Sequence, residues 1–322
     1  MSQDFHATLT GIFPRSEELV EATRGLDRGR VTPAHCEAVR VEDTRKVIDL
    51  QRAAGFAFHT DGQLGWQDLF RPLVDRTRGL EAGALTRWFD NNTFYRRPVV
   101  RGDLVLKGGL GPGAFRTRLD ESARWKVVLP GPYTFARAAE GQGEAGLRAG
   151  RVEAFGDLLR GAARWCAERG ARRFQFSEPW LVYGQPSRAD LAAAEAAYET
   201  ITKGLRAETL VFPYFGDLKR VFPAILDFPV DAVGVDLTAT DLDALEEHAF
   251  DKGLVLGAVD GRNSLVETPQ DIVSHAREAL DRLDPDWVAV APSCEMELLP
   301  RPVAEAKVRA LGAAVALGRD TL

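Results

Sequence analysis

Four acidic side chains follow short apolar segments of the chain, where they could act as acids, bases or ligands. They are Asp61, Glu178, Asp236 and Asp260, named here the acidic ring. Together these carboxylates could bind an amino group or a metal ion, or transfer protons in a reaction. Each could equally cap a following helix or accept hydrogen bonds from loop N–H groups, which is the commoner role for a single carboxylate. The sequence leaves both roles open.

Cys294 follows another apolar segment and is a candidate metal ligand or nucleophile. A buried, inert thiol is the commoner outcome for this residue type. No histidine lies close to Cys294 in the sequence, and only His59 among the histidines is expected at the end of a strand. The sequence therefore predicts no convincing zinc triad.

The segment 85–98 is too aromatic for a solvated loop and too polar for a core strand. Trp88 offers a flat apolar face, whereas Asp90 and Asn92 offer fixed hydrogen-bonding groups. This mixture is typical of a surface that grips a small molecule. The alternative is a structural hairpin that caps one end of the core, and composition alone favours neither.

Further side chains could hold a substrate at the same place. Arg15 and Arg262 could bind an anionic tail, although solvated surface arginines are the default expectation. Tyr133 could stack on a planar ring or simply pack in the core. The remaining candidates for substrate binding are Tyr214 and Asn263.

A regular succession of strands must position these residues. Eight short apolar segments predict strands at residues 5–13, 56–61, 125–129, 173–176, 209–214, 232–237, 254–259 and 287–291. Polar, Gly and Pro residues gather after these segments, which is typical of a (β/α)8 TIM barrel with its active site at the carboxyl ends of the strands. An open doubly wound sheet is the competing architecture, but no GxGxxG motif follows the first predicted strand. We therefore expect an α/β fold in which residues 1–322 form a single barrel domain.

Helix signals separate the predicted strands. We expect helical segments at residues 15–26, 33–54, 66–80, 149–169, 187–205 and 303–317, with further helices opening at Thr240 with Asp243 and at Thr268 with Pro269. The glycine-rich residues 101–118 predict an inserted β-hairpin rather than a barrel strand, and we place this excursion near residues 96–123.

Composition excludes several classes of function. The net charge of −6 and the scattered Lys and Arg residues argue against a nucleic-acid partner, and no apolar run approaches the length of a membrane span. The three cysteines are far apart and form no CxxC pair, which predicts reduced thiols. The amino terminus lacks the features of a signal peptide, so a cytoplasmic location is expected.

The motifs resemble those of the cobalamin-independent methionine synthase family, whose full-length members contain two related barrels. The resemblance lies in residues 85–98, 256–263 and 290–294, and it extends from about residue 8 to residue 311. In these patches the chain looks more like the amino-terminal barrel than the catalytic carboxyl-terminal one.

The resemblance also implies where a cofactor would lie. The catalytic barrel of the family holds zinc with a His-x-Cys pair after strand five, an acid after strand six and a further Cys near strand eight. The corresponding positions here carry Phe212 and Tyr214, then Asp236, then Cys294, so two of four ligands are missing. The resemblance therefore predicts no definite cofactor. If zinc is bound, Asp236 and Cys294 are the ligands that remain for it.

The resemblance also indicates which residues correspond to the homocysteine-binding site of the family. The homocysteine-binding Gly-Ser of the family corresponds to Gly11 and Ile12, and its Asp-Glu-Pro to residues 177–179, while Asp61 replaces the acid after strand two. The resemblance implies S-methyl transfer from a methylated folate or similar donor to homocysteine, an activity like that of a 5-methyltetrahydropteroyltriglutamate–homocysteine methyltransferase that would need a zinc-bearing partner barrel. An independent enzyme with a remodelled site and a non-catalytic bracing subunit are the alternatives.

Overall fold

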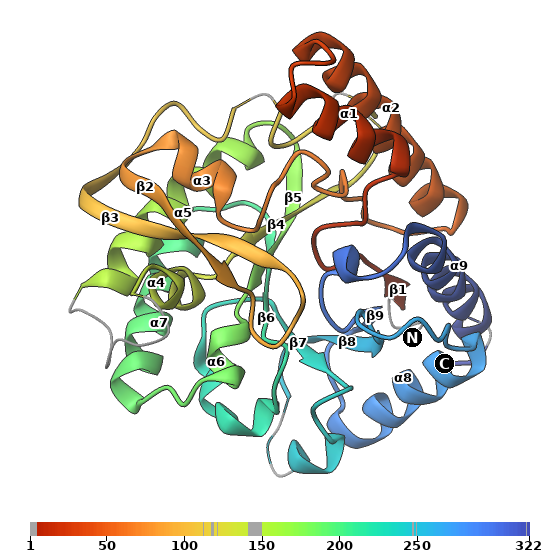
Figure 1. Cartoon of the computed structure of the whole chain (residues 1–322). Helices are drawn as coiled ribbons and strands as arrows, with labels where there is room; N and C mark the ends of the chain where they lie inside the picture. The colour runs from red at the N-terminus through yellow and green to blue at the C-terminus, as the bar shows by residue number, and fades with distance from the viewer. Residues whose placement is uncertain are drawn as a thin grey trace.

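A curled parallel sheet forms the centre of the computed structural model, which describes residues 5–111, 113–116, 119–120, 122–140, 150–246, 248, 250–319 and 321–322. The sheet has seven strands in the order β1-β9-β8-β7-β6-β5-β4 (Figure 1). These are β1 (His6–Ala7), β4 (Trp125–Pro130), β5 (Ala171–Ser177), β6 (Glu208–Phe212), β7 (Ala232–Asp236), β8 (Gly253–Val259) and β9 (Val288–Pro292). Because their backbones run parallel, their carboxyl ends lie on one face of the molecule.

The eighth strand position is held by a short extended segment rather than a full strand. A parallel bridge joins His59 to Trp125, and the His59 N–H donates to the Arg124 carbonyl at 2.9 Å. The predicted barrel-type α/β fold is thereby confirmed, but strands expected at residues 5–13 and 56–61 are shorter than predicted. Side chains help to join this region to β1, because Lys126 Nζ donates to Thr8 Oγ1 at 3.0 Å and to the Leu9 carbonyl at 2.6 Å.

Helices surround the sheet (Figure 1). They are α1 (Glu17–Asp27), α2 (Pro33–Ala53), α3 (Arg71–Arg76), α4 (Pro132–Glu140), α5 (Arg151–Ala167), α6 (Pro179–Tyr183), α7 (Arg188–Thr202), α8 (Pro269–Leu283) and α9 (Arg301–Gly318). The predicted starts of α2, α7 and α8 are confirmed, since Thr32, Ser187 and Thr268 each accept a hydrogen bond from a first-turn N–H. None of the helices in the described ranges has the length and apolar character needed to cross a membrane.

The helix predicted after Thr240 is wrong. The segment opened by Thr240 and Asp243 contains the short 3-10 helix η4 (Leu242–Ala244). Asp241 rather than Thr240 caps this turn, accepting from the Asp243 N–H at 3.1 Å, whereas the Thr240 hydroxyl accepts from the Leu218 N–H at 2.9 Å. The other 3-10 helices of the described chain are η2 (Leu218–Arg220), η3 (Ala224–Asp227) and η5 (Met296–Leu298).

An antiparallel hairpin is inserted between α3 and β4 and crosses the mouth of the barrel (Figure 1). Its strands are β2 (Thr77–Arg87) and β3 (Phe94–Leu106). The inserted hairpin is confirmed, but it begins earlier than the expected residues 96–123, some of which lie outside the described ranges. The helix predicted over 66–80 is wrong outside α3, because residues 66–70 are not helical and Thr77 pairs with Leu106 and Leu80 with Val100 across the hairpin.

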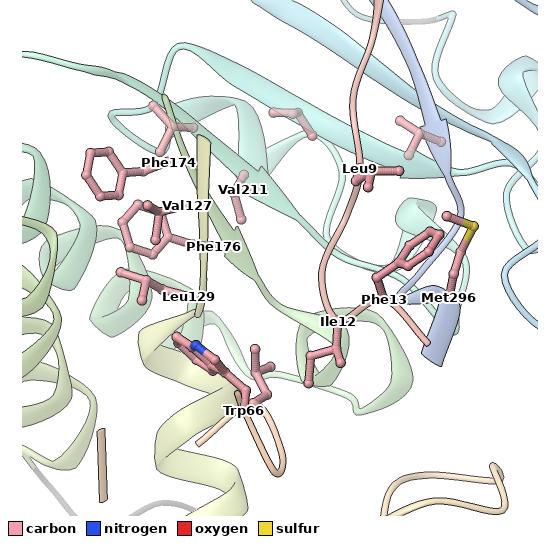
Figure 2. Packing of buried hydrophobic residues seen from close by; sticks show 14 of the residues in the cluster. Leu9, Ile12, Phe13, Trp66, Val127, Leu129, Phe174, Phe176, Val211 and Met296 are labelled. Carbon is pink, nitrogen blue, oxygen red and sulfur yellow. The ribbon is translucent and has the colours of Figure 1, made fainter. Parts of the chain in front are cut away.

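The core has two layers that follow the alternation of the strands. Val211 on β6 faces the helices, where it packs with Val127, Phe174 and Phe176 (Figure 2). The intervening residues Leu210 and Phe212 point to the interior of the barrel. There they pack with a separate cluster of buried side chains: Tyr214, Ala232, Val255, Ala289, Ala291 and Cys294.

Candidate functional site

Glu178, at the carboxyl end of β5, is fully buried and bonded to the start of a neighbouring helix. Its carboxylate accepts from the N–H groups of Tyr133 at 3.0 Å and Thr134 at 2.7 Å, in the first turn of α4. The Tyr198 hydroxyl donates to it at 3.3 Å. Burial raises the pKa of Glu178 to about 7, although these hydrogen bonds oppose the shift. Glu178 therefore caps α4 from another strand, with the predicted binding residue Tyr133 buried directly above it.

Two other members of the acidic ring are bound to loop backbone. Asp61 accepts from the N–H groups of Gln63 and Arg116, both at 3.0 Å. Asp236 accepts from Phe215 N–H at 3.0 Å and from the Thr238 hydroxyl at 2.6 Å. Burial is the main cause that raises the pKa of both carboxyls. Each side chain thus fixes the loop that follows its strand.

Asp260, the fourth member, lies in a more open loop after β8. Its carboxylate accepts from the Arg262 N–H at 2.8 Å, and Asn263 makes the same kind of turn with the Leu265 N–H at 3.0 Å. Arg262 and Asn263 are exposed, and the Arg262 guanidinium lies 5.0 Å from the Phe215 ring centre. The carboxylates of the acidic ring therefore accept hydrogen bonds from backbone N–H groups of loops and of one helix. They do not converge on a common ligand position.

Cys294 lies after β9, fully buried in the interior cluster. Its Sγ points to the Glu295 carbonyl at 3.5 Å. Burial raises the pKa of the thiol well above its usual range, and the charges of Glu295 and Asp236 raise it further. A thiol in such surroundings stays protonated at neutral pH and is a poor metal ligand or nucleophile.

The residues present do not fit a zinc ion. The Phe212 ring packs so closely on Gly234 that a methyl group added there would lie 1.7 Å from the ring. Tyr214 is fully buried beside Phe212, with ring centres 6.0 Å apart. Within the described ranges, no three His, Cys, Asp or Glu side chains converge as metal ligands. Aromatic rings thus fill the interior next to Cys294.

A polar pair that the sequence reasoning missed lies beside these rings. The Tyr214 hydroxyl donates a hydrogen bond to Glu295 Oε1. Burial raises the pKa of Glu295 to about 7 and that of Glu297 to about 8, and the charge of Glu295 adds to the second shift. The available signal was positional but weaker than for the acidic ring, since Glu295 lies in the loop after β9 (Val288–Pro292), whereas Glu178 and Asp260 follow their strands directly.

The hairpin tip covers this region with aromatic side chains. Trp88 and Phe89 are buried, and the Phe89 ring centre lies 4.9 Å from that of Trp180 and 5.4 Å from that of Phe215. Asp90 is exposed and accepts from the Tyr183 hydroxyl at 3.1 Å. Trp88 therefore lies buried at the barrel mouth. Asp90 joins the hairpin tip to α6 through its hydrogen bond with Tyr183, and Asn92 is exposed to solvent.

Two neighbouring spaces, both lined in part by Thr93, lie next to this tip. The larger, with a volume of about 750 Å³, is lined by Ile12, Arg15, Thr93, Glu297 and Arg301 among others. The smaller is a crevice of about 10 Å³ that shares Ile12, Thr93 and Glu297 with the larger pocket. The larger pocket is of the size expected for a small-molecule site.

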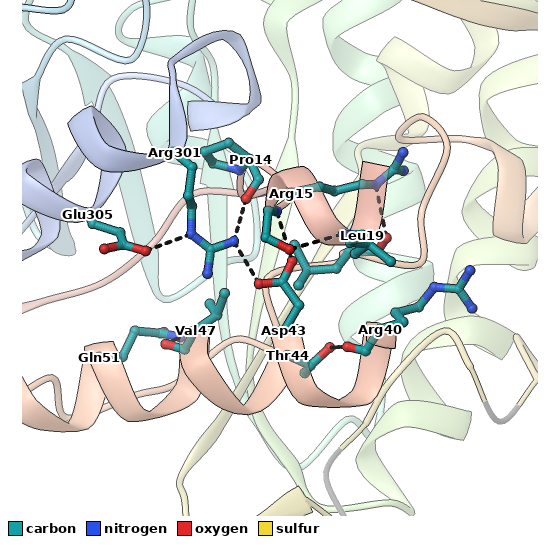
Figure 3. Close-up of polar contacts among 12 residues, drawn as sticks. Pro14, Arg15, Leu19, Arg40, Asp43, Thr44, Val47, Gln51, Arg301 and Glu305 are labelled. Atoms are coloured by element: carbon teal, nitrogen blue, oxygen red, sulfur yellow. Dashed lines mark hydrogen bonds and ion pairs between the residues drawn. The ribbon is translucent and has the colours of Figure 1, made fainter. Parts of the chain in front are cut away.

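Hydrogen bonds hold the wall of the larger pocket. Arg15 donates to the carbonyls of Leu64 at 3.1 Å and Trp66 at 2.5 Å. Arg301 donates to the Pro14 carbonyl at 2.7 Å and pairs with Asp43 at 3.0 Å (Figure 3). These contacts join α2, α9 and the loop after β1, so the pocket has a preformed wall.

Comparisons with known proteins agree with this architecture. A family model described as the cobalamin-independent synthase, N-terminal domain, matches residues 58–282. The chain is 24% identical over 310 residues to a methionine synthase of Saccharolobus solfataricus, with 94% of this chain and 91% of the relative covered. It is 32% identical over 297 residues to a 5-methyltetrahydropteroyltriglutamate–homocysteine methyltransferase of Mycobacterium tuberculosis, covering 81% of this chain but 38% of that longer protein.

A solved structure shows the same fold. The B12-independent methionine synthase from Shewanella sp. W3-18-1, determined in complex with selenomethionine, superposes with a TM-score of 0.77 at 18% sequence identity. The superposition covers 98% of this chain and 97% of that one.

Proposed function

Because the chain belongs to the cobalamin-independent methionine synthase family, we propose that it acts in S-methyl transfer, with homocysteine as the acceptor and a methylated folate or similar molecule as the donor. The observation that carries the proposal is the pocket of about 750 Å³ at the barrel mouth, lined by Arg15, Arg301 and Glu297. A mouth pocket with fixed polar groups is the usual substrate site of such barrels.

The chain's own residues would bind and orient substrate there. Arg15 presents a positive charge in the pocket wall while its donors fix the backbone at Leu64 and Trp66. The buried rings of Trp88 and Phe89 exclude water on the side of the hairpin. A free thiol has a pKa of about 8.5, so at neutral pH it needs help to become a thiolate. Since Phe212 and Tyr214 leave no fitting metal site, we assign that help to a separate zinc-bearing barrel.

Binding and activity measurements test the proposal together. Methyltetrahydrofolate and homocysteine are titrated separately into the purified protein by calorimetry, and methyl transfer is measured with and without a zinc-bearing barrel of the family. Binding of the folate, with transfer only in the mixture, is the expected result. Methyl transfer by the isolated protein would show that no partner barrel is needed. If neither ligand binds and the protein does not change methyl transfer by the partner barrel, the proposal is contradicted. An effect on the partner without binding would support a bracing subunit.

One observation favours an independent enzyme with a remodelled site as the second candidate. The Tyr214 hydroxyl and Glu295 form a buried hydrogen-bonded pair, and burial raises the pKa of Glu295 to about 7. Such a pair could transfer a proton to or from a substrate near neutral pH. Tyr214→Phe keeps the ring and removes the hydroxyl. Loss of turnover in this variant with unchanged thermal stability would favour this candidate over the partner-dependent one.

A further inference from the structure

Another pocket, of about 320 Å³, lies between α2, α3 and the segment 110–114 that follows the hairpin. Three arginines line it and give it the name used below, the arginine pocket. Arg40 comes from α2, whereas Arg71 and Arg76 come from the two ends of α3. The proposed methyl transfer assigns no role to any of these three side chains.

Positive charge exceeds negative charge in this lining. Among the described residues that line the pocket, Asp75 is the one carboxylate, and it pairs with Arg71 at 3.1 Å. The lining therefore keeps two positive charges in a chain whose net charge is −6. Glu37, outside the lining, pairs with Arg40 at 2.6 Å but is shared with Arg116 at 2.7 Å. An anion is the complementary ligand for such a site.

The Arg40 side chain, which extends from α2, provides an independent observation that points to a ligand (Figure 3). Its Nη1 donates to Glu37 at 2.6 Å, and its Nη2 lies 3.6 Å from the Cys36 thiol. Its Nε is buried, yet this N–H has no acceptor in the described part of the chain. A buried donor without an acceptor is costly because its desolvation is not repaid. An anionic oxygen in the pocket that Arg40 lines would supply the acceptor.

Arg76 is held in place but keeps free donors. Its Nε donates to the Gly109 carbonyl at 3.3 Å. The backbone at Gly111, where φ is +87°, approaches the guanidinium so closely that an added methyl group would lie 3.3 Å from Nη2. Neither terminal nitrogen of Arg76 has a hydrogen bond or ion pair with a residue of the described ranges. These nitrogens can therefore bind a ligand without breaking an existing contact.

The walls of the arginine pocket limit the size of the ligand. A methyl group on Gly65 would lie 3.2 Å from the Gly113 carbonyl oxygen and 3.4 Å from Arg40 Cδ, so glycine leaves space between these walls. Leu110 and Ala114 add buried apolar surface to the lining. A volume of about 320 Å³ is at the lower end of the range for small-molecule pockets. The pocket therefore suits a small anion with a short carbon chain.

We infer that the arginine pocket binds the phosphoryl group of a small phosphate monoester. Such a group carries a charge of about −1.5 to −2 at pH 7, which matches the two positive charges that the lining keeps. The planar guanidinium groups of Arg40 and Arg76 are suited to bidentate contacts with phosphate oxygens. The carbon chain of the ester would contact Leu110 and Ala114. A carboxylate or sulfate ester, with one negative charge, would leave one positive charge unmatched.

Matched anions test the inference by calorimetry on the full chain, in a phosphate-free buffer at pH 7.5 and constant ionic strength. Propyl phosphate and propyl sulfate have nearly the same shape, but the phosphate carries the larger negative charge. We expect propyl phosphate to bind with a Kd below about 1 mM and at least about tenfold more tightly than propyl sulfate. Inorganic phosphate should bind more weakly than propyl phosphate because it lacks the carbon chain.

Two variants and a control assign the binding to the arginine pocket. Arg40→Gln and Arg76→Gln should each weaken propyl phosphate binding by at least about tenfold, because each removes a charged hydrogen-bonded contact. Arg78→Gln removes the same charge from an exposed position on β2, two residues beyond Arg76 and outside the lining. This control should bind like the wild type. Circular dichroism melting of all three variants checks that they fold.

Several outcomes would overturn the inference. They are no saturable binding of propyl phosphate up to about 10 mM, equal affinity for the phosphate and the sulfate ester, and unchanged binding in both pocket variants. An equal loss in Arg78→Gln would show a general charge effect rather than a site. Tighter binding of inorganic phosphate than of propyl phosphate would overturn the assignment to an ester. None of these measurements depends on methyl transfer, so the inference and the proposed function can fail separately.

Discussion

Glu178 and Glu295 are both buried carboxyls whose pKa burial raises to about 7, but their surroundings give them different roles. Each lies over a glycine, since a methyl group on Gly131 would be 2.1 Å from Glu178 Cδ and one on Gly11 would be 2.5 Å from Glu295 Cγ. Glu178 uses both oxygens on the first turn of α4. Glu295 instead lines a crevice. Burial alone therefore does not identify a functional carboxylate.

Replacement of Glu178 tests its structural role. Glu178→Ala leaves the N–H groups of Tyr133 and Thr134 without their acceptor and creates a cavity, so the free energy of unfolding should fall by about 2–4 kcal/mol. Urea unfolding followed by circular dichroism measures the change. Glu199→Ala, an exposed position on α7, should change it by no more than about 0.5 kcal/mol. Equal effects of the two substitutions would contradict the helix-capping role.

Glu297 should make stability depend on pH. Its pKa of about 8 in the folded chain exceeds the ordinary value of 4.5, so the folded state binds the proton more tightly than the unfolded state. The stabilisation is complete below about pH 4.5 and is lost as the pH rises toward 8. Between pH 5.5 and pH 8, the wild type should lose about 1–2 kcal/mol more unfolding free energy than Glu297→Gln. Parallel pH profiles of the two proteins, from urea unfolding at each pH, would refute this assignment.

The hairpin shows which elements local sequence could not predict. The barrel strands are continuous apolar runs buried on both faces, so residues 125–129 or 254–259 carry their own signal. Strand β2 has exposed positions on both sides, and its structure comes from pairing with β3, where Thr77 meets Leu106. That partner is distant in the chain, and helical spacing within residues 66–80 misled the prediction.

The sequence predicted where the acidic side chains lie relative to their strands but not what they contact, for a related reason. The strand-end rule correctly indicated where Asp61, Glu178 and Asp236 would lie. It could not show that loop and helix N–H groups occupy these carboxylates, because the donors come from segments folded back from elsewhere, such as Arg116 on Asp61. Glu297 is two residues further from its strand and required the actual backbone path to reach the pocket.

The hairpin tip should stabilise the fold through Trp88. The Trp88 ring packs edge to face on Phe70, Phe89 and Tyr95, with ring centres 4.6–5.7 Å apart. Trp88→Ala should lower the unfolding free energy by about 3 kcal/mol, because it removes these ring contacts and leaves a cavity. Leu85→Ala, on the same hairpin but 63% exposed, should change stability by less than about 0.5 kcal/mol. If Trp88→Ala behaves like Leu85→Ala in urea unfolding, the tip is not a packed cover.

A buried ion pair joins three elements around the larger pocket. Asp43 on α2 pairs with Arg301 on α9 at 3.0 Å and accepts from the Ser16 N–H at 3.0 Å, next to the loop after β1. Asp43→Ala removes the more buried of the two ion-pair partners of Arg301, leaving it Glu305 at 2.9 Å, and takes the acceptor from the Ser16 N–H, so the unfolding free energy should fall by about 3 kcal/mol. Asp49→Ala, an exposed position on the same helix, is the control and should have little effect. Similar destabilisation in both variants would contradict a specific role for the Asp43–Arg301 pair.

The filled barrel interior bears on whether a bound metal stabilises the protein. A metal that binds only the folded state raises the thermal midpoint, and its removal lowers it. Phe212 packs on Gly234, the Tyr214 hydroxyl donates to Glu295, and the Cys294 thiol is protonated. These residues therefore offer no site at which bound zinc could stabilise the folded state. We therefore expect excess EDTA or added zinc to shift the thermal midpoint by less than about 1 °C.

Metal analysis of the same samples completes the test, with zinc measured per chain before and after dialysis against EDTA. Stoichiometric zinc, lost together with several degrees of thermal stability and absent from Cys294→Ser, would contradict the aromatic-filled interior. Sub-stoichiometric zinc that leaves the midpoint unchanged would agree with it. In that case the proposed methyl transfer would require a second molecule to activate the thiol, because Phe212 and Tyr214 fill the barrel interior beside Cys294.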